Sequence, residues 1–125
     1  MNDKINLAHK LSLFDDQWSP KIIGALNGQL VKLAKIQGEF EWHSHAAEDE
    51  LFMVVEGSMT LELRDDEGHV DEFFLSPGEL YIVPRGVEHR PVSPDGASIM
   101  LFEPAATRNT GEHVTEKTVT DLGWI

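Results

Sequence analysis

Two histidines one residue apart, His43 and His45, stand in the stretch EWHSHAAEDELFMVVEG at residues 41–57. In an extended chain, residues two apart point to the same face, and their Cα atoms lie about 6.5 to 7 Å apart. From that separation two imidazoles can converge on one metal ion at about 2.0 to 2.1 Å. The spacing predicts a pair of metal ligands, and the alternative is two surface histidines on an acidic protein.

Glu50 follows this pair and begins the next expected strand. Its carboxylate would complete a set of two imidazoles and one carboxylate, which suits non-haem Fe(II) and related ions and leaves positions open for water or substrate. Glu48 and Asp49 are alternative ligands if the intervening loop is tighter than assumed. Phe52 has the same parity as Glu50 and is expected to keep the site apolar.

A further candidate ligand is His89, which follows a turn formed by Pro84 and Gly86. That turn would return the chain so that His89 faces the same interior. Local periodicity does not establish this convergence, because it depends on the fold.

Short apolar segments rich in β-branched and aromatic residues make up the middle of the chain, and each is bounded by turn residues. They predict strands at 21–26, 29–36, 51–56, 58–64, 70–76, 80–84 and 97–103. Two-residue hairpin turns are expected at Asn27–Gly28 and Glu56–Gly57, and further turns at 65–68, 76–78 and 94–96. Many short strands at near-regular spacing indicate a sandwich or barrel.

The N-terminal segment has a different pattern. Leu7, Leu11 and Phe14 recur at helical spacing behind possible caps at Asn2 and Asp3, which predicts a short amphipathic helix. Residues 105–125 are polar and end in Trp124–Ile125, so we expect an irregular tail whose end docks on the barrel or on a second subunit.

Charge and composition limit the partners. The 125 residues include 22 acids against 10 bases, a formal net charge of -12, which disfavours nucleic acid and anionic membrane surfaces. With no cysteine, the available strong metal ligands are His, Asp and Glu. We find no signal peptide and no apolar run long enough to cross a bilayer, and we expect a cytoplasmic protein.

Two motifs in this chain resemble those of the cupins. The first motif consists of Gly38, His43, His45, Glu50 and Gly57. It departs from the family pattern in one respect, because four residues and not five separate Gly38 from His43. The second motif consists of Gly78, Pro84, Gly86 and His89, with Ser93 in the position where the family has asparagine.

The resemblance implies an all-β fold, a double-stranded β-helix (jelly-roll or cupin barrel) with a short N-terminal helix. It divides one domain of residues 1–125 into an N-terminal helical segment at 1–17, a β-barrel at 18–104 and a C-terminal tail at 105–125. It also implies that His43, His45, Glu50 and His89 bind one divalent metal ion, Fe, Mn, Ni or Zn. The chain looks most like small single-domain cupins of the mannose-6-phosphate isomerase-like type, a label that reflects fold more than reaction.

These expectations favour a metal-dependent enzyme, of dioxygenase or isomerase/lyase type, that acts on a small polar metabolite. The alternative is a non-catalytic module that binds a sugar or a carboxylate, and a homodimer is expected in either case. Glu41 and Tyr81 are candidate catalytic residues, and Phe52, Tyr81 and Met100 are candidate pocket residues, each with surface or core packing as the alternative. A phosphosugar substrate would need cations near the metal, for which the candidates are Lys32, Lys35, Arg85 and Arg90.

Overall fold

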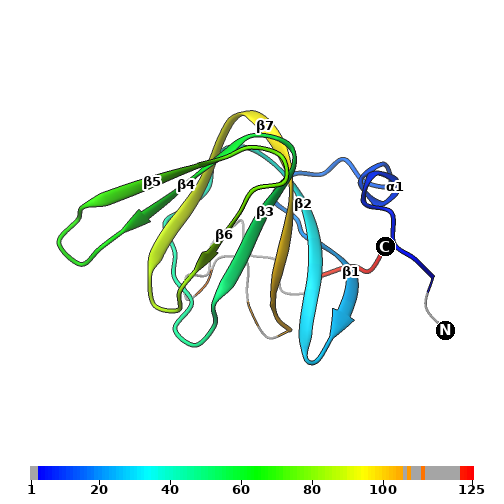
Figure 1. Cartoon of the computed structure of the whole chain (residues 1–125), viewed down its shortest axis with the longest axis horizontal. Coiled ribbons are helices and arrows are strands. Elements are labelled where there is room, and N and C mark those ends of the chain that lie inside the picture. The colour runs from blue at the N-terminus through cyan, green and yellow to red at the C-terminus, as the bar shows by residue number, and fades with distance from the viewer. Residues whose placement is uncertain (1–2, 106, 108–110, 112–121) are drawn as a thin grey trace.

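The computed structural model describes residues 3–105, 107, 111 and 122–125, which form one short helix and a set of antiparallel strands (Figure 1). The helix is α1 (Leu7–Leu11). The strands are β1 (Lys21–Leu26), β2 (Gln29–Glu39), β3 (Glu50–Gly57), β4 (Met59–Arg64), β5 (Val70–Leu75), β6 (Leu80–Val83) and β7 (Glu88–Pro104). This architecture confirms the expected all-β fold.

The longest strand, β7, joins two layers of sheet. Its second half pairs with β2 and β3 in the order β1-β2-β7-β3-β6. Its first half pairs with β4, which in turn pairs with β5, and also with the end of β2 at Val92 and Ser93. Figure 1 shows these strands curving around a common interior. The turn expected at 94–96 is absent, because the chain passes through these residues as a bulge between Ser93 and Ala97, opposite Ile36 and Gly38 of β2.

The hairpin expected at Asn27–Gly28 is confirmed. Leu26 pairs with Gln29, and both residues between them have positive φ, 49° for Asn27 and 76° for Gly28, as a type I′ turn requires.

The hairpin expected at Glu56–Gly57 was wrong, because β3 pairs with β6 and β7 and not with β4. The chain instead crosses from one layer to the other at this point, against the bulge of β7. Gly57 has a φ of 78°, and a Cβ there would meet the carbonyl oxygen of Gly96 at 2.4 Å. Glycine is therefore needed for close approach of two backbones.

Much of the barrel interior is apolar, and β2, β3 and β7 each contribute alternate residues to it. Ala34 and Ile36 of β2, Phe52 and Val54 of β3, and Ile99 and Leu101 of β7 lie in one buried cluster. Ser93, in the position of the family's asparagine, is also buried, and its hydroxyl donates to the carbonyl of Ser58 at 2.6 Å.

The outer face of the same sheet carries α1. Leu11, Phe14 and Leu33 pack there with Leu7 and Met100, which confirms the amphipathic spacing. The helix is shorter than expected, and its N-cap is Asn6 rather than Asp3, with the Asn6 side chain accepting from the His9 amide; Asn2 lies outside the described residues. No helix in the described part of the chain is long and apolar enough to span a membrane.

Most of the predicted tail lies outside the described residues, but its end is described. Ile22 of β1 donates to the carbonyl of Gly123 at 2.8 Å and accepts from Ile125 at 3.1 Å. The C-terminus therefore docks on the barrel, along the outer edge of β1.

Candidate metal centre

The structure brings the four predicted ligands together. One ligand atom from each of His43, His45, Glu50 and His89 lies within 4.8 Å of all the others, and all four side chains are buried. His43 and His45 are therefore buried inside the barrel and are not two surface histidines.

Backbone hydrogen bonds hold the two motifs in contact. His43 and His89 each donate an amide hydrogen bond to the other's carbonyl, at 3.1 and 2.8 Å, and the Gly86 amide donates to the carbonyl of His45 at 2.8 Å. Asp49 accepts from the backbone amide of Arg85 at 2.9 Å. These hydrogen bonds thus connect the 43–49 loop, which leads to Glu50, to the 85–89 segment.

Hydrogen bonds to backbone carbonyls also orient two of the rings. The Nδ1 atoms of His43 and His89 lie 2.8 and 2.9 Å from the carbonyl oxygens of Glu41 and Val87. When Nδ1 donates to such a carbonyl, the Nε2 lone pair is directed away from it, the arrangement typical of metal-bound histidine. These rings are therefore set to present Nε2 to the interior.

The contact between His89 and Glu50 is one that a neutral imidazole alone cannot satisfy. His89 Nε2 lies 3.2 Å from Glu50 Oε1, while its Nδ1 faces the Val87 carbonyl. A neutral imidazole carries a single N–H, so it cannot donate to both acceptors. Either an extra proton or a metal ion must separate the ring from the carboxylate, and three imidazoles with one carboxylate fit Fe, Mn, Ni or Zn.

The protonation states suit metal binding. Burial, and secondarily the proximity of His89, lowers the pKa of His43 to about 4, so this ring is neutral at physiological pH. Burial alone would raise the pKa of Glu50, but hydrogen bonds with Glu103, His45 and His89 outweigh it and hold that pKa well below the ordinary value. Metal binding requires these same forms, a neutral imidazole and an ionised carboxylate.

An ion pair that the sequence did not predict lies behind Glu50. Lys32 Nζ and Glu103 Oε1 are 2.8 Å apart, and both side chains are 1 % exposed. Burial and the charge of Glu50 raise the pKa of Glu103 well above its ordinary value, in spite of Lys32. The signal that could have found this pair is parity, since each charged residue shares the apolar face of its strand with interior residues such as Ile36 and Leu101.

Comparison with known proteins identifies the family. Residues 29–103, which contain every residue of both motifs, match Cupin_2, a cupin domain. The chain belongs to the cupin family.

Similar solved structures agree with this assignment. A cupin-2 domain protein of Shewanella frigidimarina NCIMB 400 is 43 % identical, with a TM-score of 0.74 over 80 % of this chain and 93 % of that one. Protein NMB1881 of Neisseria meningitidis is 33 % identical, with a TM-score of 0.71 over 82 % of this chain and all of that one. The mannose-6-phosphate isomerase type is not part of what these likenesses show.

One curated relative also matches. The uncharacterised protein YdbB of Bacillus subtilis (strain 168) is 37 % identical over 68 residues, which are 54 % of this chain and 57 % of that protein. The match therefore spans little more than half of YdbB. At a greater distance, hydroquinone 1,2-dioxygenase PnpCD in complex with Fe3+ shares the fold, with a TM-score of 0.72 and 19 % identity.

The remaining predicted residues of this cupin occupy different places. Phe52 lines the cavity beside the ligands. Tyr81 stacks on Phe73 with the ring centroids 4.3 Å apart, and Met100 packs on the outer face toward α1. Glu41 contributes its carbonyl to His43, while its buried Oε2 has no hydrogen-bond partner. Catalytic roles for Glu41 and Tyr81, and substrate contacts by Tyr81 and Met100, stay predictions.

The four basic residues considered for phosphate binding each form an ion pair or a hydrogen bond with another residue of the chain. Their partners are Glu103 for Lys32, the Phe14 carbonyl for Lys35, Asp49 for Arg85, and Glu62 and Glu39 for Arg90.

Of the alternative ligands to Glu50, Asp49 pairs with Arg85, and Glu48 accepts from the Ala47 amide. Glu50 is thus the acid that joins the three histidines.

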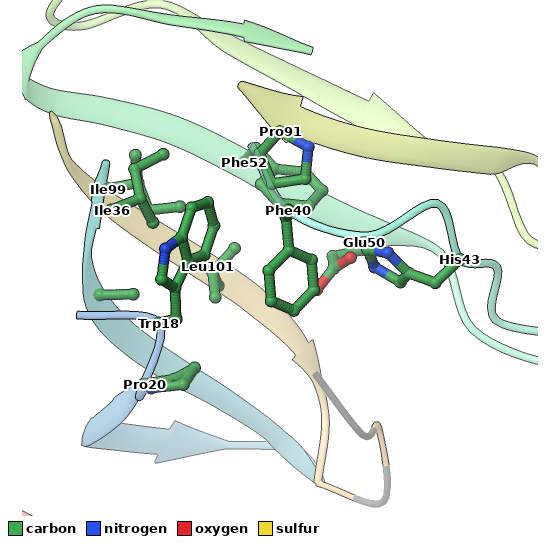
Figure 2. A pocket seen from close by; sticks show the side chains of 11 residues that line it. Trp18, Pro20, Ile36, Phe40, His43, Glu50, Phe52, Pro91, Ile99 and Leu101 are labelled. Atoms are coloured by element: carbon green, nitrogen blue, oxygen red, sulfur yellow. The ribbon is translucent and has the colours of Figure 1, made fainter. Parts of the chain in front are cut away.

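A small cavity of about 40 Å³ adjoins the ligands. Figure 2 shows His43 and Glu50 at one end of it and Trp18, Ile36 and Leu101 toward the other, with Phe40 between them. Trp18 and Phe40 were not expected to line a cavity, because neither lies in a strand predicted from the sequence.

Proposed function

We propose that this cupin binds one divalent metal ion through His43, His45, Glu50 and His89 and catalyses a metal-dependent reaction on a small metabolite. The observation that carries the proposal is the convergence of four buried side chains, three imidazoles and one carboxylate, whose ligand atoms all lie within 4.8 Å of one another. The reaction is of dioxygenase or of isomerase/lyase type, and the ion is Fe, Mn, Ni or Zn.

A bound divalent ion would act as a Lewis acid on a substrate oxygen or, with iron, support oxygen chemistry. The chain's own residues prepare the site for it. The carbonyls of Glu41 and Val87 fix the ring orientation of His43 and His89, and ionised Glu50 offsets part of the positive charge. The apolar wall excludes bulk water, which strengthens electrostatic interactions with the reacting group.

Metal content tests the first half of the proposal. Untagged protein should hold about one equivalent of metal by elemental analysis, and His89→Ala should lose most of it. His69→Ala is the matched control, because His69 is exposed in the β4–β5 turn and pairs with Asp65. If wild type takes up no metal after anaerobic incubation with Fe, Mn, Ni and Zn, the proposal is wrong.

Turnover tests the second half. The iron-loaded protein is screened for oxygen uptake with small keto acids, diketones and sugars, and the Mn, Ni and Zn forms are screened for isomerised or cleaved product. Conversion that disappears in His89→Ala supports an enzyme. A compound that binds tightly and is recovered unchanged from every metal form would establish the alternative, a non-catalytic binding module.

We also propose that the chain forms a homodimer and uses neither nucleic acid nor membrane as a partner. The dimer is supported by exposed apolar side chains, Phe74 on β5 and Leu80 and Ile82 on β6, two strands that each have an open edge in the described structure. Sedimentation of the untagged protein measures its oligomeric state directly.

A further inference from the structure

The cavity beside the candidate ligands has almost entirely apolar walls. Among the described residues that line it, the titratable ones are His43 and Glu50, both members of the ligand set. The other lining side chains are hydrocarbon or aromatic, and they include Ile36, Phe52, Ile99 and Leu101. A molecule in this cavity therefore meets polar groups only where the metal would be held.

Such walls discriminate against hydroxyl groups. A buried hydroxyl that finds no hydrogen-bond partner loses its solvation without compensation, at a cost of about 1 to 3 kcal/mol. A sugar carries several hydroxyls, and the walls away from His43 and Glu50 offer them little. The part of the ligand that lies beyond the metal-binding group must therefore be apolar.

The size of the cavity is a second limit. Its volume of about 40 Å³ is well below the roughly 150 Å³ of a dry cavity that holds benzene. By proportion it has room for about one or two carbon atoms.

Trp18 forms one wall and is held firmly. Its ring stacks on Phe40 with centroids 4.8 Å apart, and its Nε1 donates to the carbonyl of Gln37 at 3.2 Å. Its backbone amide donates to the carbonyl of Lys35 at 2.8 Å. Contacts at both ring and backbone resist the movement that a larger ligand would require.

We propose that the substrate is a compact molecule with one oxygen-bearing metal-binding group and a short uncharged carbon tail, and that Trp18 sets the upper size of that tail. The inference rests on the proposed function, since the metal anchors the polar end. It narrows the expected small polar metabolite to one with a single polar end. Sugars and molecules whose aromatic ring must enter the cavity fall outside this class.

A series of hydroxamates tests the tail while keeping the metal-binding group constant. Binding to the nickel-loaded protein is measured by calorimetry for propionohydroxamate, for glycolohydroxamate, which replaces the terminal methyl by a hydroxyl, and for benzohydroxamate. We expect propionohydroxamate to bind about tenfold more tightly than either of the other two compounds. A difference of one chemical group in an apolar pocket typically changes the affinity by about this factor.

Variants of the wall test the role of Trp18. Trp18→Ala should strengthen benzohydroxamate binding by roughly tenfold and leave the metal content unchanged. Ala34→Val, which adds methyl groups to another lining residue, should weaken propionohydroxamate binding. The control is Trp124→Ala, since Trp124 is 61 % exposed at the edge of β1 and should change neither. If Trp18→Ala does not fold, Ala34→Val still tests whether the size of the cavity limits the tail.

The outcomes separate the two proposals. If the loaded protein binds glycolohydroxamate or benzohydroxamate as tightly as propionohydroxamate, the tail inference is overturned and the metal proposal stands. If no metal binds, the proposed function is overturned, and the cavity is tested in the metal-free protein with xenon, which enters dry apolar cavities. Xenon-dependent shifts of the Ile36, Ile99 and Leu101 methyl resonances would then support an apolar ligand pocket, and their absence would overturn it.

Discussion

His43 is the ligand candidate whose buried ring most clearly links protonation to stability. Its folded pKa of about 4 lies below the 6.5 of an exposed histidine. As pH falls from 6.5 to 4, the unfolded chain takes up a proton that the folded chain does not, so the free energy of unfolding decreases. Glu50, whose folded pKa is also depressed, adds to this loss as the pH falls below about 4.5.

We therefore predict that the metal-free protein loses about 2 kcal/mol of stability between pH 7.5 and pH 5 through His43 alone. Urea unfolding at the two pH values measures the loss. His43→Gln should reduce it, whereas a change at exposed His69 should not. An equal pH dependence in wild type and His43→Gln would contradict the assigned pKa.

Gly57 is a second residue for which a single substitution tests the structure, because its backbone lies against that of Gly96. Gly57→Ala places a Cβ 2.4 Å from the Gly96 carbonyl oxygen at a φ of 78°, and we predict a loss of at least about 2 kcal/mol. Gly28→Ala is the control, because Gly28 has a similar φ of 76° but nothing within 4 Å of the added Cβ. Equal losses in urea unfolding would show that backbone conformation, and not the close approach, determines the cost.

At the scale of elements, the Lys32–Glu103 pair joins β2 to β7 inside the barrel. Without Lys32, the buried Glu103 carboxyl, whose pKa is already raised, must either stay ionised beside Glu50 with no partner or take up a proton, so Lys32→Met should cost about 3 kcal/mol at pH 8. Replacing both, as Lys32→Met with Glu103→Leu, should recover much of that loss, because no buried charge is then left alone. Urea unfolding of the single and double variants gives the coupling energy directly, and additive losses would rule out a specific pair.

At the scale of the whole molecule, metal binding should stabilise the fold. The four ligands come from the 43–50 segment and from β7, so they converge only in the folded chain. Metal at 100 times its Kd should add about 2.7 kcal/mol, or about 10 °C in Tm. Calorimetric scans of wild type with and without metal measure this, and His89→Ala should show little of the increase. A similar increase in His89→Ala would place the metal elsewhere.

Much of the fold and the ligand set was open to prediction from the sequence. Alternation along short segments predicted the strands, because side-chain parity is a local property of extended backbone. The Asn27–Gly28 hairpin could also be predicted from local sequence, because both residues tolerate the positive φ that the turn requires. His43, His45 and Glu50 were recognisable from types and spacing, while His89 required the family resemblance.

Pairing between distant strands was decided only by the tertiary structure. Whether Glu56–Gly57 is a hairpin depends on what β3 and β4 pair with, and both pair with β7, a strand far along the chain from either of them. The ion pair of Lys32 and Glu103 is likewise separated by 71 residues. Trp18 lines the cavity because hydrogen bonds to Lys35 and Gln37 of β2 hold it there. Residue types and local spacing determined which groups were available for chemistry, but long-range packing alone set which of them meet and how much space lies between them.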